Sequence, residues 1–284
     1  MTESMHGKTV MVTGATDGIG LVTARELARQ GARVLLVGRN EQKGQRAISA
    51  IRQAARGADL EFHRADLSRL SDIRRLAVTI AESEPQLDVL VNNAGGIFGQ
   101  RQETEDGYER TFALNHLNYF LLTNLLLEKL REAPSGRIVN VASRAHVGAQ
   151  IAFDDPHLSR DYKGWRAYKQ SKLANILFTR ALAERLEGST VTANALHPGF
   201  VRTRFGGDNP TVFRMGVRLA MAAMAISVEE GAKTPIFLAS SPAVEGKSGG
   251  YYVKSAEARP DSAAMDPAAA ERLWDMSREM TATR

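Results

Sequence analysis

The chain has 284 residues, of which 43% are hydrophobic and 24% charged, a composition that is ordinary for a globular protein with a sizeable buried core. It contains no cysteine, which excludes disulfides, thiolate metal sites and cysteine nucleophiles. The formal net charge is +5, but the basic residues are scattered rather than gathered in a block, which disfavours a nucleic-acid-binding protein.

The N-terminus predicts no targeting segment. The polar start MTESMHGK has no apolar stretch of the kind that a signal peptide needs. No run of about 18 apolar residues occurs along the chain, so we expect no transmembrane helix and no integral membrane segment. We therefore expect a cytoplasmic protein.

Strand-like and helix-like segments alternate along the chain. The predicted strands cover residues 8–14, 33–37, 60–66, 87–93, 136–143, 190–199 and 249–253. The predicted helices cover residues 18–30, 41–56, 107–132 and 165–187, with a further helix between Ser68 and Pro85. This rhythm predicts an α/β fold: a single doubly wound Rossmann-type domain with a seven-stranded, mostly parallel sheet and helices on both faces.

The alternation shows no pause that would mark a linker, so we expect one domain over residues 1–284 with its core at about 8–253. The tail at about 254–284 is rich in alanine and polar residues. We expect this tail to be loosely packed.

The segment TGATDGIG, residues 13–20, joins the first predicted strand to the first predicted helix. Gly14 follows the strand, and Gly18 and Gly20 open the helix, so the backbone can turn tightly and approach a ligand. The helix N-terminus, with its N–H groups and positive dipole end, suits a phosphate. The turn therefore predicts a dinucleotide pyrophosphate site, with packing alone as the alternative.

The end of the second predicted strand indicates which dinucleotide is bound. NAD-binding folds usually carry an acidic residue there for the ribose hydroxyl. In this chain Gly38 occupies that place and Arg39 follows. A guanidinium favours a 2′-phosphate through charge-assisted hydrogen bonds, so we expect NADP(H), unless Arg39 simply faces solvent.

Tyr168 and Lys172 are four residues apart on a predicted helix, so they share one face. An ammonium beside a phenol favours phenolate and is expected to lower the pKa of Tyr168. Tyr168 could then donate a proton to a carbonyl oxygen in reduction or remove one from an alcohol in oxidation. A surface pair without function is the alternative.

Two further polar residues fit the same chemistry. Ser143 ends the fifth predicted strand, at the carboxyl edge where doubly wound sheets bind ligands, and its hydroxyl can hold a substrate oxygen. Asn115 interrupts the apolar helix TFALNHLNYFLLT, where asparagine is disfavoured unless its amide or the local backbone has a partner. It either holds a proton-relaying water or makes a structural hydrogen bond.

These motifs together resemble the short-chain dehydrogenase/reductase family. The chain carries TGATDGIG, NNAG at 92–95, Asn115, NVAS ending at Ser143, YKQSK at 168–172 and HPGFVRT at 197–203, in the order of that family. The resemblance covers residues 8–253, and it is greatest to the retinol-dehydrogenase-like branch. It departs from the family at Ala142, where many relatives have serine, and at Asn118, where that branch often has glycine.

The resemblance implies roles for individual residues. Tyr168 is the acid/base, Lys172 lowers its pKa, Ser143 steadies the substrate oxygen, and Asn115 anchors the relay water. The implied cofactor-binding residues are Gly14, Thr16, Asp17, Gly18, Ile19, Gly20, Arg39, Asp66, Leu67, Asn92, Ala94, Gly95, Tyr168, Lys172, Pro198, Gly199, Val201 and Thr203. Within this set, Asp66 would contact the adenine, whereas Asn92 would lie near the adenosine ribose.

The resemblance also implies a substrate lid at about 200–227, with Gly206 and Gly207 as hinges. Its apolar wall would comprise Phe213, Met215, Met221 and Met224. Such a wall suits a lipophilic aldehyde, ketone, quinone or alcohol, although methionines at this spacing can equally be ordinary core. Relatives often form dimers or tetramers through the helices at 107–132 and 165–187, so a homo-oligomer is possible.

The sequence leaves other functions open. The same fold could be a catalytically silent NADP(H)-binding sensor or a protein-interaction module. A light-driven tetrapyrrole reductase is disfavoured because such enzymes usually use a cysteine as proton source. His116, His146 and His197 lack metal partners at useful spacing, so we expect no metal and predict that they fix loops through hydrogen bonds. Tyr162 and Trp165 either shape the substrate mouth or pack a loop.

Overall fold

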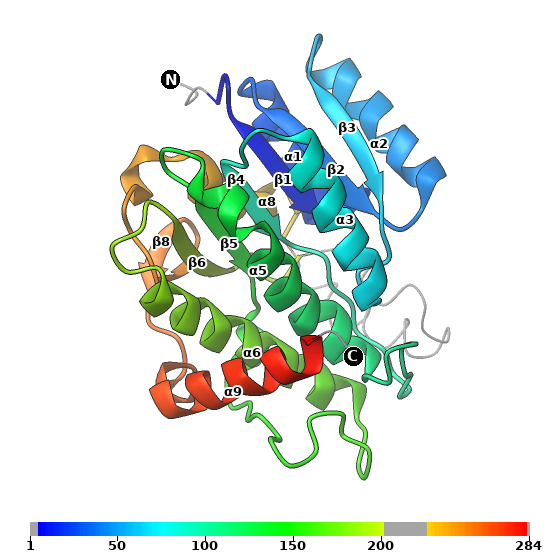
Figure 1. Ribbon diagram of the computed structural model, residues 1–284, viewed down its shortest axis with the longest axis vertical. Coiled ribbons are helices and arrows are strands. Elements are labelled where there is room, and N and C mark those ends of the chain that lie inside the picture. The colour runs from blue at the N-terminus through cyan, green and yellow to red at the C-terminus, as the bar shows by residue number, and fades with distance from the viewer. Residues whose placement is uncertain (1–4, 202–225, 283–284) are drawn as a thin grey trace.

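The computed structural model describes residues 5–201 and 226–282 of the chain (Figure 1). In these ranges the strands are β1 (Thr9–Thr13), β2 (Arg33–Gly38), β3 (Leu60–Arg64), β4 (Val89–Asn92), β5 (Arg137–Val141), β6 (Thr192–His197), β7 (Tyr251–Val253) and β8 (Ala256–Ala258). They form one sheet in the order β3-β2-β1-β4-β5-β6-β7-β8. All neighbouring strands are parallel except β7 and β8.

The helices alternate with these strands as the sequence predicts. They are α1 (Gly18–Arg29), α2 (Glu41–Ala54), α3 (Leu70–Ser83), α4 (Arg110–Phe112), α5 (Asn118–Arg131), α6 (Gly164–Arg185), α8 (Val228–Ser240) and α9 (Pro267–Thr281). Short helical turns occur at η1 (Ala113–Leu117), η2 (Arg144–His146), η3 (Pro242–Val244) and η4 (Ser262–Met265). The predicted doubly wound fold is confirmed, with the antiparallel strand β8 as an eighth strand beyond the seven expected.

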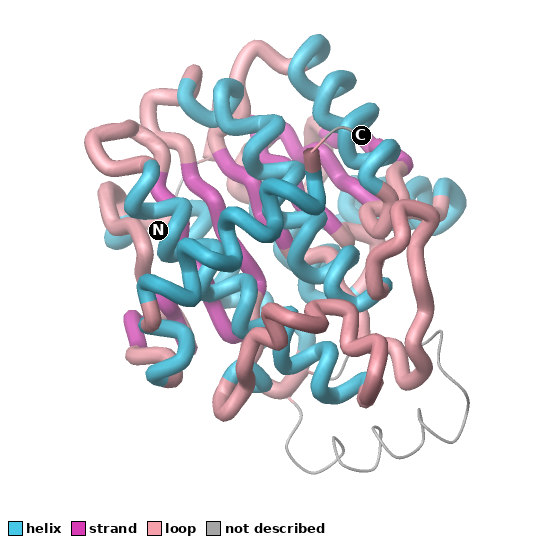
Figure 2. The backbone as a smooth tube through the Cα atoms, turned by 60° about the horizontal axis from the view of Figure 1, so that its bottom comes forward, coloured by secondary structure: helices cyan, strands magenta, loops and turns pink. Residues whose placement is uncertain are grey.

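Helices cover both faces of the sheet, as Figure 2 shows for the strands enclosed between them. On one face α3, α5 and α6 bury residues such as Ile73, Leu126 and Phe178 against the strands. On the other face α1, α2 and α8 contribute residues such as Leu27 and Ile51. Strands buried on both faces read as continuous apolar runs, which is why they were readable from the sequence.

The helix predicted over 107–132 is not continuous. Helix α4 begins at Arg110 and passes through the π-helical turn η1 before α5 starts at Asn118. The Asn118 N–H donates to the Ala113 carbonyl in the i→i−5 pattern of a π-turn. The Asn118 side-chain amide donates to the Leu114 carbonyl at 3.3 Å. Asn118 therefore supplies from its side chain the bond that its backbone would make in an α-helix.

The tail is well packed, contrary to the expectation of a loose segment. Helix α9 lies across α6 (Figure 1), and its residues Ala270, Leu273 and Ser277 are buried. The Trp274 ring stacks on Phe178 of α6 with centroids 5.9 Å apart. The amphipathic spacing of these residues is a helix signal that the alanine-rich composition obscured. Helix α9 covers parts of α5 and α6, the helices expected to carry an oligomer interface.

We expect Leu273→Ala to lower the free energy of unfolding by about 3 kcal/mol, because it leaves a cavity beneath α9. Leu273 is only 1% exposed and belongs to the cluster formed with α6. Urea unfolding measures the change, with the exposed Glu279→Ala as control, for which the expected change is within about 0.5 kcal/mol. Equal stability of the two variants would show that the tail does not belong to the folded core.

Candidate active site

The turn between β1 and α1 has the geometry that its glycines predict. Gly14 and Gly18 have φ of +66° and +57°, in the left-handed region that favours glycine. A Cβ on Gly20 would lie 2.4 Å from the Gly14 carbonyl oxygen, so the helix start packs directly on the turn. Asp17 caps α1 by accepting a hydrogen bond from the Gly18 N–H at 2.8 Å.

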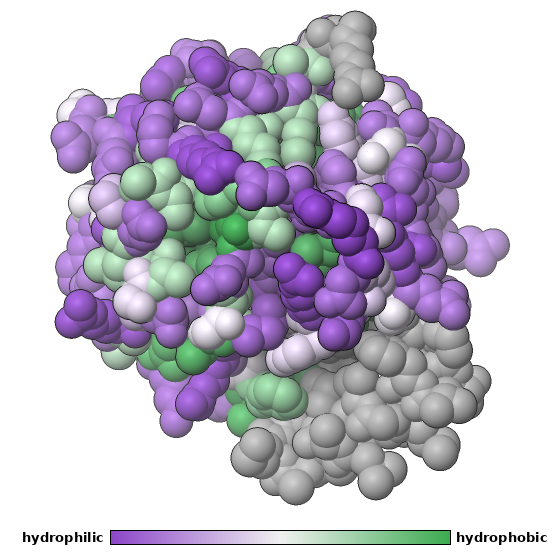
Figure 3. Space-filling view, turned by 90° about the horizontal axis from the view of Figure 1, so that it is seen from below, coloured by the Kyte–Doolittle hydropathy of each residue, from purple (hydrophilic) through white to green (hydrophobic). Residues whose placement is uncertain are grey.

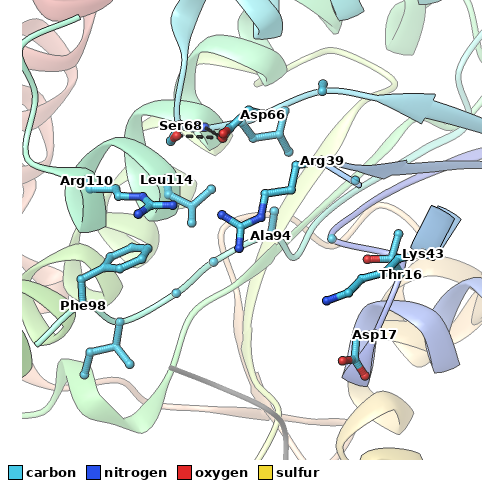
Figure 4. Close-up of a pocket in the computed structure, with 17 residues that line it drawn as sticks. Thr16, Asp17, Arg39, Lys43, Asp66, Ser68, Ala94, Phe98, Arg110 and Leu114 are labelled. Carbon is cyan, nitrogen blue, oxygen red and sulfur yellow. Dashed lines mark hydrogen bonds between the residues drawn. The ribbon is translucent and has the colours of Figure 1, made fainter. Parts of the chain in front are cut away.

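A cavity of about 380 Å³ opens beside this turn, at the carboxyl ends of the strands (Figure 4). The predicted cofactor residues that line it are Gly14, Thr16, Asp17, Arg39, Asp66, Leu67, Ala94 and Gly95. Its other lining residues are Gly38, Lys43, Ala65, Ser68, Gly96, Ile97, Phe98, Arg110 and Leu114. The structure thus brings together segments that follow β1, β2, β3 and β4 around one space.

Three cations line this cavity, of which the sequence reading found only Arg39. Lys43 lies in the first turn of α2, and Arg110 opens α4 on the other side of the cavity (Figure 4). The Arg110 guanidinium lies over the Phe98 ring, 4.3 Å from its centroid. Lys43 could have been sought in the first turn of the helix that follows Arg39. Nothing in the sequence marks Arg110.

The two carboxylates that line the cavity already have partners. Asp17 caps α1, and Asp66 accepts hydrogen bonds from the Ser68 N–H at 3.0 Å and the Ser68 hydroxyl at 2.7 Å. The structure also accounts for the missing acid on β2. A Cβ on Gly38 would lie 2.7 Å from the Thr16 methyl carbon, so a larger residue there would displace Thr16. The balance of charge in this cavity favours an anionic ligand.

The four predicted catalytic residues converge next to the cavity. A hydrogen bond joins Tyr168 to Ser143, and Lys172 Nζ lies 5.8 Å from the centroid of the Tyr168 ring. A Cβ on Gly95, which lines the cavity, would lie 3.1 Å from Asn115 Oδ1 and 3.7 Å from Lys172 Nζ. Residues from β5, η1 and α6 thus meet the segment that follows β4.

Asn115 is fully buried in the π-turn and fixed on two sides. Its amide exchanges hydrogen bonds with the backbone of Gly96, with Nδ2 to the carbonyl at 2.9 Å and the N–H to Oδ1 at 2.8 Å. Nδ2 also donates to Ser171 Oγ at 2.9 Å, and Ser171 in turn donates to the Tyr168 carbonyl at 2.8 Å. The side chain therefore ties the segment after β4 to the helix that carries Tyr168 and Lys172.

Burial dominates the titration of the two central groups. It raises the pKa of Tyr168 to about 12, although the hydrogen bond with Ser143 partly opposes this effect. Burial also lowers the pKa of Lys172 to about 7. The expectation of a lowered Tyr168 pKa is therefore wrong for this structure, because desolvation of the phenolate is the largest effect on this group. A phenol with this pKa is protonated at neutral pH.

Lys172→Met is expected to be more stable than the wild type at pH 7 by on the order of 2 kcal/mol. Burial lowers the Lys172 pKa from 10.5 in the unfolded chain to about 7, so unfolding takes up a proton between these values. The wild type is therefore stabilised as pH rises through this window, and the advantage of the variant shrinks.

Urea unfolding of Lys172→Met at pH 7 and about pH 10 measures this difference. The Val141 carbonyl, which accepts from Lys172 Nζ at 2.8 Å, keeps Asn175 Nδ2 and the Tyr119 hydroxyl, each at 3.4 Å. The substitution therefore leaves no buried acceptor unpaired. A variant that is less stable at pH 7 would contradict the assigned burial penalty.

Asn92 lies elsewhere than the resemblance implied. It is fully buried and does not line the cavity; its Nδ2 donates to Thr123 Oγ1 and to Asn140 Oδ1, both at 2.9 Å. The neighbouring Asn93 contacts the turn instead, donating from Nδ2 to the Thr13 carbonyl at 2.8 Å. Asn92 thus joins β4 to β5 and α5. The sequence of two adjacent asparagines does not reveal which one contacts the glycine-rich turn.

The other predicted cofactor residues that the structure describes lie in the first turn of α1 and in the segment after β6. Ile19 belongs to the first turn of α1, and Pro198, Gly199 and Val201 follow β6. Val201 packs against α8, since a Cβ on Gly231 would lie 2.5 Å from its methyl carbon. Thr203 and the predicted lid residues Gly206, Gly207, Phe213, Met215, Met221 and Met224 lie outside the described residues.

His146 and His197 fix loops, as predicted, whereas His116 lies in the π-turn η1 and bonds Ser277 of helix α9. His146 Nδ1 bonds the Ser143 carbonyl at 2.7 Å, and its Nε2 accepts from the Asp261 N–H at 3.1 Å. His197 Nδ1 accepts from the N–H groups of Arg144 and Gly199 at 3.2 and 3.3 Å. Within residues 5–201 and 226–282, no three histidine or acidic side chains gather as a metal site would require.

None of the helices that the structure describes combines the length and the hydropathy needed to cross a bilayer. Location in the cytoplasm stays a prediction.

Fold and site together define a class of protein. A doubly wound sheet carries a glycine-rich turn at its first strand and a cation-lined cavity at its carboxyl edge, which is the arrangement of a dinucleotide-binding protein. A serine, a tyrosine and a lysine meet beside that cavity. Such a group can give a proton to a carbonyl oxygen or take one from an alcohol.

Comparisons with known proteins agree with this class. The family model for short chain dehydrogenases matches residues 8–211. Retinol dehydrogenase 14 of Homo sapiens is 43% identical, over 97% of this chain and 87% of the relative. A crystal structure of an uncharacterised protein from Mycobacterium paratuberculosis has a TM-score of 0.80 at 34% identity, covering 98% of this chain and 95% of its own. The Pseudomonas aeruginosa RhlG/NADP active-site complex has a TM-score of 0.71 at 28% identity, covering 87% and 94%.

The chain therefore belongs to the short-chain dehydrogenase/reductase family, and within it to the retinol-dehydrogenase-like branch. This family consists of oxidoreductases that use a nicotinamide cofactor and act on small molecules.

Proposed function

We propose that the protein is an NADP(H)-dependent oxidoreductase that reduces a lipophilic aldehyde, ketone or quinone, with Tyr168 as the proton donor. The observation that carries the proposal is the meeting of Tyr168, Ser143 and Lys172 beside a cavity lined by three cations. Bound NADPH supplies the hydride that the carbonyl carbon receives. The residues of the chain bind the two reactants and deliver the proton to the oxygen.

The cofactor choice rests on the adenosine end of the cavity. Arg39 and Lys43 line it from β2 and α2, and Gly38 leaves no carboxylate to repel a 2′-phosphate. The related RhlG structure is a complex with NADP, which supports the same choice. The residues present thus fit NADP(H) better than NAD(H).

The protonation state of Tyr168 favours reduction. A phenol whose pKa is about 12 is protonated at neutral pH, and it can donate to the more basic alkoxide that forms as a carbonyl is reduced. Oxidation would need the phenolate, which is scarce at that pKa. Ser143, hydrogen-bonded to Tyr168, lies where its hydroxyl can hold the same substrate oxygen. Lys172 lies beside this pair, and Asn115 fixes the adjoining Gly96 backbone and Ser171.

An exposed aromatic side chain next to Tyr168 supports a lipophilic substrate. Trp165 is 53% exposed and stacks on the Tyr168 ring with centroids 5.7 Å apart, so it is not simply a packed loop residue. Val147 and Phe200, which follow Ser143 and Gly199, are also exposed. Seen from below, the surface has hydrophobic residues gathered around a hollow with hydrophilic residues about it (Figure 3).

A screen of NADPH oxidation over aldehydes, ketones and quinones tests the proposal. We expect turnover with apolar carbonyl compounds and much weaker turnover with NADH. Tight NADPH binding without turnover on any carbonyl class would replace the enzyme with a cofactor-binding sensor. Turnover only with NADH would overturn the cofactor assignment.

A further inference from the structure

We propose that Ser277 of the C-terminal helix α9 is a positioning residue for the active site, acting through His116 on the π-turn that carries Asn115. The inference rests on the proposed function, because Asn115 matters only if the site is catalytic. It assigns to the tail a part in catalysis.

The contact between α9 and the π-turn is a single buried hydrogen bond. His116 Nε2 and Ser277 Oγ are 2.8 Å apart, and both residues are fully buried. The Ser277 hydroxyl also donates to the Leu273 carbonyl at 2.7 Å, which fixes its direction within α9. Burial lowers the pKa of His116 to about 3, so the ring is neutral throughout the range in which enzymes are assayed. The bond is therefore present at every working pH.

Helix α9 is itself held firmly, so it can serve as a reference for the turn. The Tyr108 hydroxyl, just before α4, donates to the Met280 carbonyl at 2.6 Å. Trp274 packs on Phe120 of α5 and Phe178 of α6. Ser277 lies between these anchors, one helical turn from each side. Its hydroxyl therefore meets His116 at a fixed place.

The π-turn needs such support because its backbone pattern is less favourable than that of an α-helix. Asn118 supports its C-terminal end through the bond to the Leu114 carbonyl. His116 supports its middle, directly after Asn115, and planar peptide units transmit a shift of one residue to the next. Without the Ser277 hydroxyl, the His116 ring loses its partner on α9 and keeps its contacts with Asn175, Phe112 and Phe178. The middle of the turn is then no longer held from α9.

The displacement would reach the reacting groups through Asn115. Its Nδ2 bonds Ser171, which adjoins Lys172, and its Oδ1 accepts from the Gly96 N–H at 2.8 Å. Neither Ser277 nor His116 lines the cofactor cavity. Loss of the bond should therefore lower kcat while the KM for NADPH is kept.

The test compares Ser277→Ala with a matched control on the same helix, Thr281→Val. Thr281 is also buried, and its hydroxyl donates to the Ser277 carbonyl at 2.7 Å, so the control removes the same kind of intrahelical bond without touching His116. We expect kcat to fall about five- to tenfold in Ser277→Ala and less than about twofold in Thr281→Val, the loss corresponding to one buried hydrogen bond. The KM for NADPH should change less than about twofold in both.

A second readout separates this inference from the proposed function. The side-chain amide signals of Asn115 in an ¹H–¹⁵N NMR spectrum should shift in Ser277→Ala and stay in place in Thr281→Val, whether or not a substrate is known. If the wild type turns over no carbonyl compound but these signals move, the proposed function fails and the positioning contact stands. Unmoved signals, or equal kcat losses in the two variants, would overturn the inference. Should Ser277→Ala fail to fold, Ser277→Cys, a weaker hydrogen-bonding group of similar size, is expected to show the same shift at smaller amplitude.

Discussion

Replacing Tyr168 by Phe is expected to lower kcat for NADPH-dependent carbonyl reduction by about 10²–10⁴-fold, the range that a positioned acid contributes. The substitution removes the hydroxyl that bonds Ser143 and leaves the ring, which is buried and stacks on Trp165. Ser143 and Lys172 stay beside the ring, but the phenol proposed to donate the proton is gone. Stopped-flow measurement of NADPH oxidation with the best carbonyl compound from the screen gives the value.

Two controls make this loss specific. NADPH affinity, measured by fluorescence, should change less than about threefold, since Tyr168 does not line the cation-lined cavity. Tyr252→Phe removes another buried phenol, on β7, whose pKa burial also raises, and it should keep kcat within about twofold. Turnover that survives in Tyr168→Phe would show that water or Ser143 supplies the proton, and the proposed mechanism would fail.

The site also carries a cost in stability, which comes from Lys172. Burial lowers the pKa of this amine, so its charged form in the unfolded chain opposes folding at neutral pH. The Tyr168 phenol is neutral in both states at that pH, so its raised pKa brings no such cost, and Tyr168→Phe should not share the gain in stability expected of Lys172→Met. The two experiments therefore separate the contribution of the site to turnover from its cost in stability.

The parts of the structure that depend on local pattern were predictable. Continuous apolar strands, amphipathic helices and the glycines at 14, 18 and 20 specify the doubly wound sheet and its first turn. Arg39 could be assigned because the end of β2 has a fixed relation to the ligand edge. These features follow from chain order alone, since a parallel sheet brings every strand end to one edge.

The parts that depend on contacts between distant segments were not predictable. Asn92 and Asn93 are equivalent in sequence, and only the sheet decides that one faces the core and the other the turn. Arg110 lines the cavity with its guanidinium over the Phe98 ring, a contact between segments that no local pattern reports. The π-turn at Asn115 depends on partners as remote as Ser277. The raised pKa of Tyr168 reflects burial, which spacing on a helix does not report.

The cofactor preference gives the second large effect. Arg39→Asp is expected to lower kcat/KM for NADPH by about 10²–10³-fold, because it removes a charge-assisted bond and places a carboxylate near the 2′-phosphate. Activity with NADH should be kept or rise, since an acid at this edge accepts bonds from the ribose hydroxyls. The measured quantity is the ratio of kcat/KM for the two cofactors, which should reverse in the variant.

Lys43 also lines this end of the cavity, so substitutions of Lys43 test whether it shares the phosphate with Arg39. If Arg39 and Lys43 share the phosphate, Lys43→Ala alone should weaken NADPH about tenfold and leave NADH unchanged, and the two substitutions should be less than additive. Arg52→Asp makes the same charge change on an exposed position in the last turn of α2, away from the cavity, and should leave the ratio unaltered. An equal drop in that control would mean that the overall field of the protein, rather than a contact at β2, selects the cofactor. An unchanged ratio in Arg39→Asp would place the phosphate elsewhere, with Lys43 and Arg110 as the remaining cations in the cavity lining.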